Sequence, residues 1–166
     1  MEFLIFSDSH GRKRRIEEVI ARQVRPVDAV FFLGDGVGDL DDRVNGIPVI
    51  RVRGNCDWGF EAGSPVREEE TVCFEGRRIF LTHGHRFGVK SGLGGLIRAA
   101  RERGAEIVLY GHTHTPALER IPTGTEVGGE TLPKPIYCFN PGSIAEGSFG
   151  TLTLTPETIL FAHGRL

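Results

Sequence analysis

The sequence predicts an α/β domain, because short apolar runs alternate with helical stretches along its first half. Phe3 to Phe6 and Ala29 to Leu33 are continuous apolar runs, which indicate strands buried on both faces. Between them, Arg14 to Val24 places its apolar residues at helical spacing. A strand, a helix and a second strand in this order form the unit from which parallel sheets are built. We therefore expect a largely parallel sheet with helices on its faces.

Length and composition indicate one ordinary globular domain, which we expect to span residues 1–166. The 166 residues are 39% hydrophobic and 25% charged, with no internal repeat. The net charge of −2 gives no strong nucleic-acid signature. The sequence also shows no secretory signal and no apolar run near the roughly 20 residues of a membrane span. Three sparse cysteines without a CxxC motif are typical of a reducing compartment, so we predict the cytoplasm.

The rest of the chain predicts a β-hairpin, one more helix and several further strands. The hairpin spans residues 71–81 and turns at Glu75-Gly76. A helix from Leu93 to Arg103 is expected to end at Gly104. Gly59 to Pro65 and Pro122 to Lys134 have the composition of loops. The further expected strands are Pro48–Val52, Glu106–Tyr110, Ala117–Ile121, Ile136–Phe139, Thr151–Leu154 and Thr158–Phe161.

Five of the expected strands are followed by short segments rich in Asp, Asn, His and Gly. Five of the six histidines lie in these segments. Ligands in open α/β sheets bind beyond the carboxyl ends of the strands, so we expect the segments to meet at one edge. A turn-capping Asp or a hydrogen-bonded loop His would explain one segment, but not five together. The segments are Asp8-Ser9-His10-Gly11, Gly34-Asp35, Gly54-Asn55-Cys56-Asp57, His83-Gly84-His85 and Gly111-His112-Thr113-His114.

The side chains of these segments predict a metal site. Imidazole, carboxylate and amide donors without thiolate suit Mn²⁺, Fe²⁺, Zn²⁺ or Ni²⁺. In Asp8-x-His10 and His112-x-His114 the paired side chains are two residues apart, which lets them aim at neighbouring points. The number of donors exceeds what one ion needs. We therefore predict a site for two divalent ions.

The five motifs, in this order, resemble the calcineurin-like metallophosphoesterase superfamily, and most closely its small single-domain YfcE-type phosphodiesterase branch. The resemblance covers nearly the whole chain and includes Asn140-Pro141-Gly142-Ser143. It implies an α/β fold of two facing mixed β-sheets flanked by helices, a four-layer αββα sandwich. It also implies two divalent ions at the strand ends. Mn²⁺ is the expected metal, and Ni²⁺, Fe²⁺ and Zn²⁺ are the alternatives.

Carried over residue by residue, the resemblance implies seven metal ligands. Asp35 would lie between the two ions and bind both. A hydroxide held between the ions would attack phosphorus in line, so no protein nucleophile is needed. The implied activity is that of a phosphodiesterase. The ligands would be Asp8, His10, Asp35 and His114 for the first ion, and Asp35, Asn55, His83 and His112 for the second.

Position 56 departs from the wider superfamily, in which a histidine follows the asparagine. The YfcE-type branch shares Cys56, but a thiol of ordinary pKa, about 8.5, is a weak proton donor to a leaving alkoxide. His85 is the alternative donor, or it only hydrogen-bonds a ligand. We predict catalytic roles for Asp35, Asn55, Cys56 and His85. Asp57 either hydrogen-bonds a ligand or caps a turn.

Weaker features each have two interpretations. The basic run Arg12-Lys13-Arg14-Arg15 either attracts phosphate or forms a solvated face. Asn140 to Ser143 either places backbone amides near the substrate or forms an ordinary Pro-Gly turn. Cys73 and Cys138 lie in apolar strand runs and are expected to be small core residues.

Two alternatives to a phosphodiesterase stay open. One is a phosphomonoesterase of the same fold. The other is a non-catalytic protein-binding scaffold that resembles the retromer's small subunit, which need not keep every metal ligand. The resemblance implies a phosphoester as the substrate class. It identifies neither the physiological ester nor the native metal, and it leaves the oligomeric state open, a homo-oligomer included.

Overall fold

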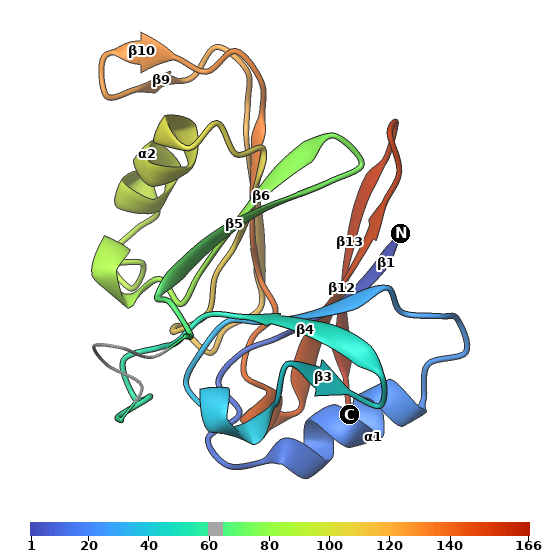
Figure 1. The fold of residues 1–166 in the computed structure, drawn as a ribbon. Coiled ribbons are helices and arrows are strands. Elements are labelled where there is room, and N and C mark those ends of the chain that lie inside the picture. The colour runs from blue at the N-terminus through green and yellow to red at the C-terminus, as the bar shows by residue number, and fades with distance from the viewer. Residues whose placement is uncertain (60–64) are drawn as a thin grey trace.

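The computed structural model describes residues 1–59 and 65–166 (Figure 1). Both α-helices in these ranges have nine residues, and no helix there is long and apolar enough to cross a membrane. The helices are α1 (Lys13–Ala21) and α2 (Gly94–Glu102), with short 3₁₀ helices η1 (Val37–Asp39), η2 (His85–Phe87) and η3 (Ile144–Glu146). The strands are β1 (Glu2–Phe6), β2 (Ala29–Phe32), β3 (Arg43–Val44), β4 (Ile47–Arg51), β5 (Glu69–Phe74), β6 (Arg77–Thr82), β7 (Ile107–Leu109), β8 (Ala117–Ile121), β9 (Glu126–Val127), β10 (Glu130–Thr131), β11 (Ile136–Asn140), β12 (Ser148–Leu154) and β13 (Ile159–Arg165).

Two mixed sheets contain most of these strands. One has the order β13-β12-β1-β2-β4-β3 and the other the order β5-β6-β7-β11-β8. Each has a parallel centre, made of β1, β2 and β4 in the first sheet and of β6, β7 and β11 in the second. The outer strands of both sheets pair antiparallel. The single, largely parallel sheet expected from the strand–helix rhythm is therefore wrong. The two facing mixed sheets implied by the family resemblance are confirmed.

The side chains of the central strands alternate between two apolar layers. On β1, Phe3 and Ile5 point into the core between the two sheets, whereas Leu4 and Phe6 pack toward α1 with Ile16. Phe3 and Phe31 stack within the inter-sheet core with their ring centroids 5.0 Å apart. Because both faces of these strands are covered, their sequences are continuous apolar runs rather than alternating patterns.

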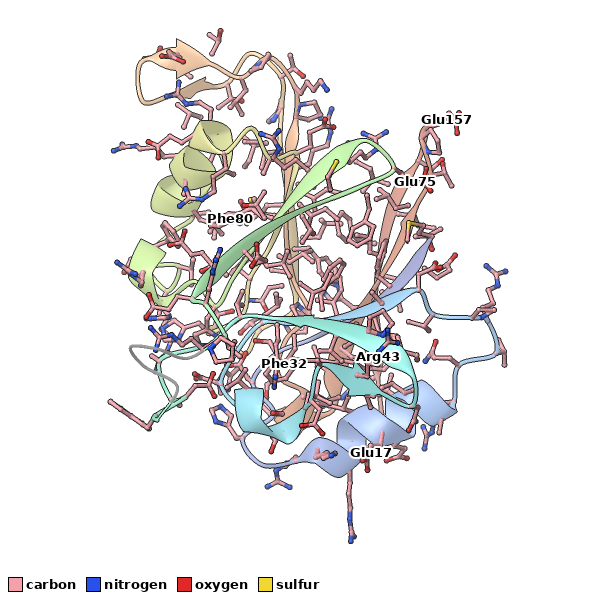
Figure 2. The ribbon with its side chains drawn as sticks, viewed as in Figure 1. Glu17, Phe32, Arg43, Glu75, Phe80 and Glu157 are labelled. Atoms are coloured by element: carbon pink, nitrogen blue, oxygen red, sulfur yellow. The ribbon has the colours of Figure 1, made fainter. Side chains whose placement is uncertain are left out.

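The second sheet is built in the same way. Ile79 and Leu81 of β6 enter the core between the sheets, and Phe80 between them packs on the α2 side with Leu96. Figure 2 shows Phe80 beside α2 and Phe32 on the α1 side of the other sheet. The layers therefore follow the order α1, six-stranded sheet, five-stranded sheet, α2, which is the predicted four-layer arrangement.

Some element boundaries differ from the sequence prediction. Helix α1 ends at Ala21, and Val24, expected inside it, is 97% exposed. The expected loop Pro122–Lys134 contains the β9–β10 hairpin, which turns at two glycines in the left-handed region. Strand β13 continues to Arg165. Of the expected loop Gly59–Pro65, residues 60–64 lie outside the described residues.

The two cysteines expected in the core have different environments. Cys138 of β11 is buried on the α2 side, as predicted. Cys73 is exposed, and its placement in the core is wrong. The alternation of β5 explains the error, because Val72 and Phe74 on either side of Cys73 pack against the inter-sheet core.

Replacing Phe31 by Ala tests the importance of the inter-sheet core. The ring is fully buried and stacked on Phe3, so Phe31→Ala should lower the free energy of unfolding by about 3–5 kcal/mol. Leu160→Ala is the control, because Leu160 is 59% exposed and should change stability by less than about 0.5 kcal/mol. Urea denaturation followed by circular dichroism measures both. Equal losses in the two variants would contradict this description of the core.

Candidate metal centre

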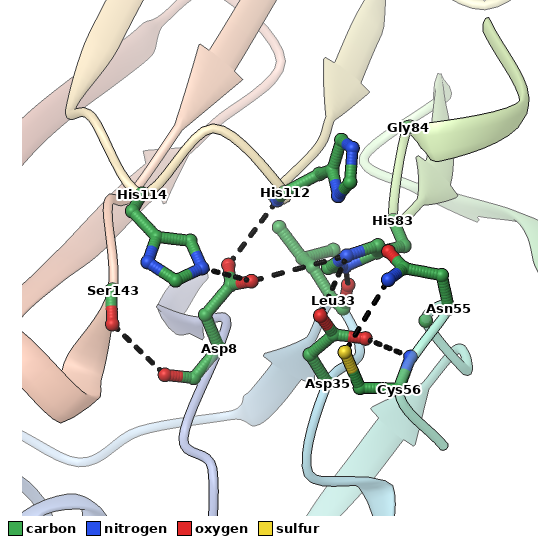
Figure 3. A network of polar contacts seen from close by, with 12 residues as sticks. Asp8, Leu33, Asp35, Asn55, Cys56, His83, Gly84, His112, His114 and Ser143 are labelled. Carbon is green, nitrogen blue, oxygen red and sulfur yellow. Dashed lines mark hydrogen bonds and ion pairs between the residues drawn. The ribbon is translucent and has the colours of Figure 1, made fainter. Parts of the chain in front are cut away.

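The segments that follow the parallel strands of both sheets come together in one place. Figure 3 shows side chains that follow β1, β2 and β4 meeting side chains that follow β6 and β7. Backbone hydrogen bonds join these segments: Asp8 N donates to Gly34 O at 2.9 Å, and Gly111 N donates to His83 O at 3.1 Å. The centre is thus built on the ends of rigid strands from both sheets.

Two groups of side chains in this place have the spacing of metal ligands. In each group one donor atom per residue lies within 4.8 Å of the others. Each group contains three of the four residues expected for one ion. The groups are Asp8 with His10 and His114, and Asp35 with His83 and His112. Asn55, the remaining expected ligand of the second ion, lies beside them in Figure 3.

His83 links the two carboxylates of the centre. Its Nδ1 lies 2.7 Å from Leu33 O, and this contact directs Nε2 at the carboxylates. Burial lowers the pKa of His83, but the two carboxylates overcome this effect and raise the pKa. Nε2 lies 3.3 Å from Asp35 Oδ2 and 3.9 Å from Asp8 Oδ1. All three side chains are buried.

Two buried atoms of the centre, His83 Nε2 and Asp8 Oδ1, have no hydrogen-bond partner among the described residues. Asp8 Oδ1 lies 3.1 Å from His114 Nε2, but without the geometry of a hydrogen bond. Unpartnered buried acceptors are costly unless a ligand satisfies them. Imidazole and carboxylate donors aimed at a shared point fit a divalent cation.

Burial and mutual interaction shift the pKa values of the centre. Burial raises the pKa of Asp8. Burial acts in the same direction on Asp35, but the neighbouring His83 overcomes it and lowers the pKa of Asp35 far below its usual range. Burial lowers the pKa of His112 to about 4, so this imidazole is neutral near pH 7. A neutral imidazole and an ionised Asp35 are the protonation states that bind metal.

The backbone of the centre is strained at the residues that carry its side chains. Seven non-glycine residues in the described ranges have a φ in the left-handed region, and five of them are predicted ligands. This conformation costs L-residues on the order of 1 kcal/mol each. Such strain persists only where surrounding contacts fix the backbone, as the hydrogen bonds below do. The five are Asp8 (φ 55°), His10 (45°), Asp35 (57°), His112 (67°) and His114 (61°).

Asp57 supplies the largest set of these contacts. Its carboxylate accepts hydrogen bonds at 2.6–2.9 Å from four backbone N–H groups, those of Asp35, Gly36, Val37 and Gly54. It therefore holds the backbone of a predicted ligand and closes the turn before Asn55. Both interpretations offered by the sequence are correct for this residue.

Two glycines are required beside Asp35 because the loops touch there. A Cβ added to Gly34 would lie 2.5 Å from Gly54 N, and one added to Gly54 would lie 2.2 Å from Asp35 Oδ1. Both positions contact backbone or a fixed carboxylate, so a side chain has no room. This explains why the motifs that contain Asp35 and Asn55 begin with glycine.

The segment that begins at the last residue of β11 also supports the centre. Asn140 Nδ2 donates to Gly111 O at 2.9 Å, and Ser143 Oγ donates to Asp8 O at 3.0 Å. The segment is thus a structural turn that holds the loops of Asp8 and His112. A contact of its amides with substrate stays a prediction.

Two carboxylates that the sequence reasoning missed also contact the centre. Asp39 accepts hydrogen bonds from Ser9 Oγ at 2.6 Å and Gly11 N at 2.9 Å, on either side of His10. Glu146 Oε1 lies 3.4 Å from His114 Nδ1. Asp39 stands four residues after Asp35 in a glycine-rich segment, a spacing that could have drawn attention to it. No sequence signal marks Glu146.

Cys56 and His85 lie at the edge of the centre. Cys56 N donates to Asp35 Oδ1 at 2.8 Å, and Cys56 Sγ lies 3.3 Å from Asn55 Nδ2. The His85 ring centroid lies 5.6 Å from that of His83, with Nδ1 buried and without a hydrogen-bond partner. Both side chains therefore lie near the centre, Cys56 beside Asp35 and His85 beside His83.

Sequence comparison identifies the family. The sequence model of the calcineurin-like phosphoesterase superfamily domain matches residues 1–162. The chain belongs to this superfamily. It is similar to the probable metallophosphoesterase YsnB of Bacillus subtilis, with 32% identity over 87% of this chain and 75% of YsnB. It is also similar to phosphodiesterase YfcE of Escherichia coli, with 34% identity over 87% of this chain and 80% of YfcE.

Solved structures share the fold. A protein from Streptococcus pneumoniae, described as a predicted phosphoesterase, has a TM-score of 0.73 and 29% identity, over 99% of this chain and 88% of that one. Vps29 from Entamoeba histolytica has a TM-score of 0.70 and 20% identity, over 100% of this chain and 99% of that one. The likeness to Vps29 shows the fold alone.

Removal of the Asp57 carboxylate tests whether it positions the centre. Asp57→Ala leaves four backbone N–H groups without their acceptor, so stability should fall by about 1–3 kcal/mol. Because the Asp35 backbone loses its support, metal affinity should fall about 10–100-fold. Isothermal titration with Mn²⁺ and urea denaturation measure the two effects. The control is Asp41→Ala on the exposed surface, and equal Mn²⁺ affinity in both variants would refute the positioning role.

Proposed function

We propose that this protein is a metal-dependent phosphodiesterase with two divalent ions in the candidate centre, and that Mn²⁺ is the preferred metal. The observation that carries the proposal is the pair of ligand groups around Asp8, Asp35 and His83, with buried acceptors that lack partners. Membership of a phosphoesterase superfamily supports hydrolysis of a phosphoester. The similarity to phosphodiesterase YfcE supports a diester as substrate.

The two groups suggest how the ions would be held. Asp35 belongs to the second group, and its carboxylate also lies within 4.8 Å of a His10 nitrogen, which supports a bridging role. Asn55 would complete the second ion's ligands as an amide oxygen. We assign Asp8, His10, Asp35 and His114 to the first ion, and Asp35, Asn55, His83 and His112 to the second.

Two such ions, when bound, lower the pKa of water and offset the charge that develops on the phosphoryl oxygens. The chain's own residues hold the geometry for that chemistry. His83 is oriented by Leu33 O, and Asp35 by the carboxylate of Asp57. His10, Asn55 and Cys56 are exposed among residues 1–59 and 65–166, so on this side an ester can reach the centre.

The candidate proton donors are both poorly suited to protonate a leaving group near pH 7. Burial, with the Asp35 carboxylate nearby, raises the pKa of Cys56 to about 11. Burial and the neighbouring His83 lower the pKa of His85, so its imidazole is neutral at that pH. A neutral imidazole and a thiol of high pKa are weak acids. The alcohol would therefore leave largely as an alkoxide.

The phosphomonoesterase and scaffold alternatives use the same fold. All seven predicted ligands are present, which favours an enzyme over a protein-binding scaffold. The three cysteines are free thiols, in agreement with the proposed cytoplasmic location.

The deciding experiment is a hydrolysis screen with the purified protein. Bis(para-nitrophenyl) phosphate and para-nitrophenyl phosphate are each tested with Mn²⁺, Ni²⁺, Fe²⁺ and Zn²⁺. Faster turnover of the diester supports the proposal. Faster turnover of the monoester would establish the phosphomonoesterase instead, and metal binding without turnover would favour the scaffold.

Substitution of Asp35 tests the bridging role. Asp35→Asn should weaken both metal sites and lower turnover by several orders of magnitude while the fold stays intact, because one carboxylate serves two ions. His114→Ala removes a ligand of one ion and should mainly weaken that site. Metal content by mass spectrometry and circular dichroism on both variants provide the measurement. Two bound ions with normal turnover in Asp35→Asn would exclude the two-ion assignment.

A histidine at position 56 tests whether the native enzyme lacks a proton donor for the leaving alcohol. In the native enzyme, turnover should fall steeply as the pKa of the leaving alcohol rises. Cys56→His offers a proton donor of pKa about 6.5. General acid catalysis by such a donor typically raises the rate about 10²–10⁴-fold. Alkyl esters should therefore gain rate, and aryl esters, which need no proton, should change little. The measurement is turnover of a diester series at saturating Mn²⁺.

Two results of that series would argue against this interpretation. A flat dependence in the native enzyme would show that a proton donor already acts, and His85 would be substituted next. A steep dependence that Cys56→His leaves unchanged would show that position 56 does not face the leaving oxygen.

A further inference from the structure

The Cys56 thiol belongs to a third group of possible metal donors. Cys56 Sγ, a nitrogen of His10 and a carboxylate oxygen of Asp35 all lie within 4.8 Å of one another. The sulfur is held there by the backbone, because Cys56 N donates to Asp35 Oδ1 at 2.8 Å. Figure 3 shows the sulfur beside the Asp35 carboxylate. The ligand set expected from the sequence contains no thiolate, so this group adds a different chemistry.

The three donors need little movement to hold one ion. Zinc binds thiolate at about 2.3 Å and imidazole at about 2.0 Å in a tetrahedron, so two such donors on one ion lie about 3.5 Å apart. The donor atoms, now within 4.8 Å of one another, would move closer by no more than about 1.3 Å. Asp35 is fixed by Asp57, whereas the side chains of His10 and Cys56 are exposed and can close on an ion.

A second observation indicates a cation at this position. The buried His83 Nε2 points at the same Asp35 carboxylate, 3.3 Å from Oδ2, and residues 1–59 and 65–166 offer it no hydrogen-bond partner. The buried Asp8 Oδ1, 3.9 Å from this nitrogen, has none either. The thiol therefore lies beside a place where buried donors lack a partner.

We infer that Cys56, His10 and Asp35 form a binding site for one thiophilic divalent ion, Zn²⁺ or Cd²⁺. Soft thiolate favours Zn²⁺ over Mn²⁺, which prefers carboxylate, carbonyl and water oxygen. On binding, the S–H bond of Cys56 breaks, its proton leaves to solvent, and a sulfur–metal bond forms. With Mn²⁺ the thiol stays protonated and uncoordinated.

The site has a consequence for activity, and this consequence rests on the proposed function. His10 and Asp35 are also assigned to the first catalytic ion. A thiophilic ion held by Cys56 takes these two ligands, so Zn²⁺ and Cd²⁺ should inhibit hydrolysis supported by Mn²⁺.

Cadmium absorption tests the site without any assay of activity. Metal-free protein is titrated with Cd²⁺, and the near-ultraviolet band of a thiolate–cadmium bond is recorded. The native protein and Cys73→Ser, which changes an exposed thiol on β5, should both develop the band. Cys56→Ser should not develop it, and its affinity for Zn²⁺ should fall at least about 10-fold. Circular dichroism establishes that each variant is folded.

The inference is overturned if the native protein shows no band at saturating Cd²⁺, or if Cys56→Ser keeps the band. In a second arm, Zn²⁺ inhibits Mn²⁺-supported hydrolysis of bis(para-nitrophenyl) phosphate, and Cys56→Ser should raise the half-inhibitory concentration at least about 10-fold. Normal hydrolysis without the cadmium band refutes this site alone. The band without hydrolysis under any metal refutes the proposed function and leaves the site standing.

Discussion

The hydrogen bond between His83 and Leu33 O is the contact on which the centre depends, because it ties one sheet to the other. His83 follows β6 of the five-stranded sheet, and Leu33 follows β2 of the six-stranded sheet. The bond fixes the ring so that its free nitrogen faces Asp8 and Asp35. The apolar core between the sheets sets the distance between them. Because this bond joins His83 to the opposite sheet, that distance also determines how far the His83 ring lies from Asp8 and Asp35. Packing far from the centre therefore controls its geometry.

The strained backbone at five predicted ligands shows what this arrangement costs. Residues in the left-handed region point their side chains in directions that an extended strand end does not allow. The cost is offset by hydrogen bonds to carboxylates outside the ligand set, notably Asp57 and Asp39. The donors are thereby held in place before any ligand arrives. Backbone strain at the centre lowers the stability of the fold, and the packing of the apolar layers around the centre compensates for it.

The sequence predicts this molecule best where a pattern is local. The apolar runs of β1 and β2 mark strands covered on both sides, and the motifs after the strands mark where the polar groups meet. Long-range pairing is less accessible, so one parallel sheet was expected where two mixed sheets form. Cys73 shows the same limit, because an apolar run does not reveal which side of an edge hairpin faces solvent. Glu146 was missed because its neighbour His114 lies far away in sequence.

The origin of the donors from both sheets also has a consequence for the order of folding. The donor set runs from Asp8 to His114, and the turn that supports Asp8 lies still further along the chain, at Ser143. Contacts between such distant segments form late, since the intervening chain must first be ordered. Neither sheet alone contains a complete group of donors around Asp35 and His83. Under the proposed function, binding of the two catalytic ions would therefore require a chain in which both sheets have docked, and it would draw the folding equilibrium toward that state.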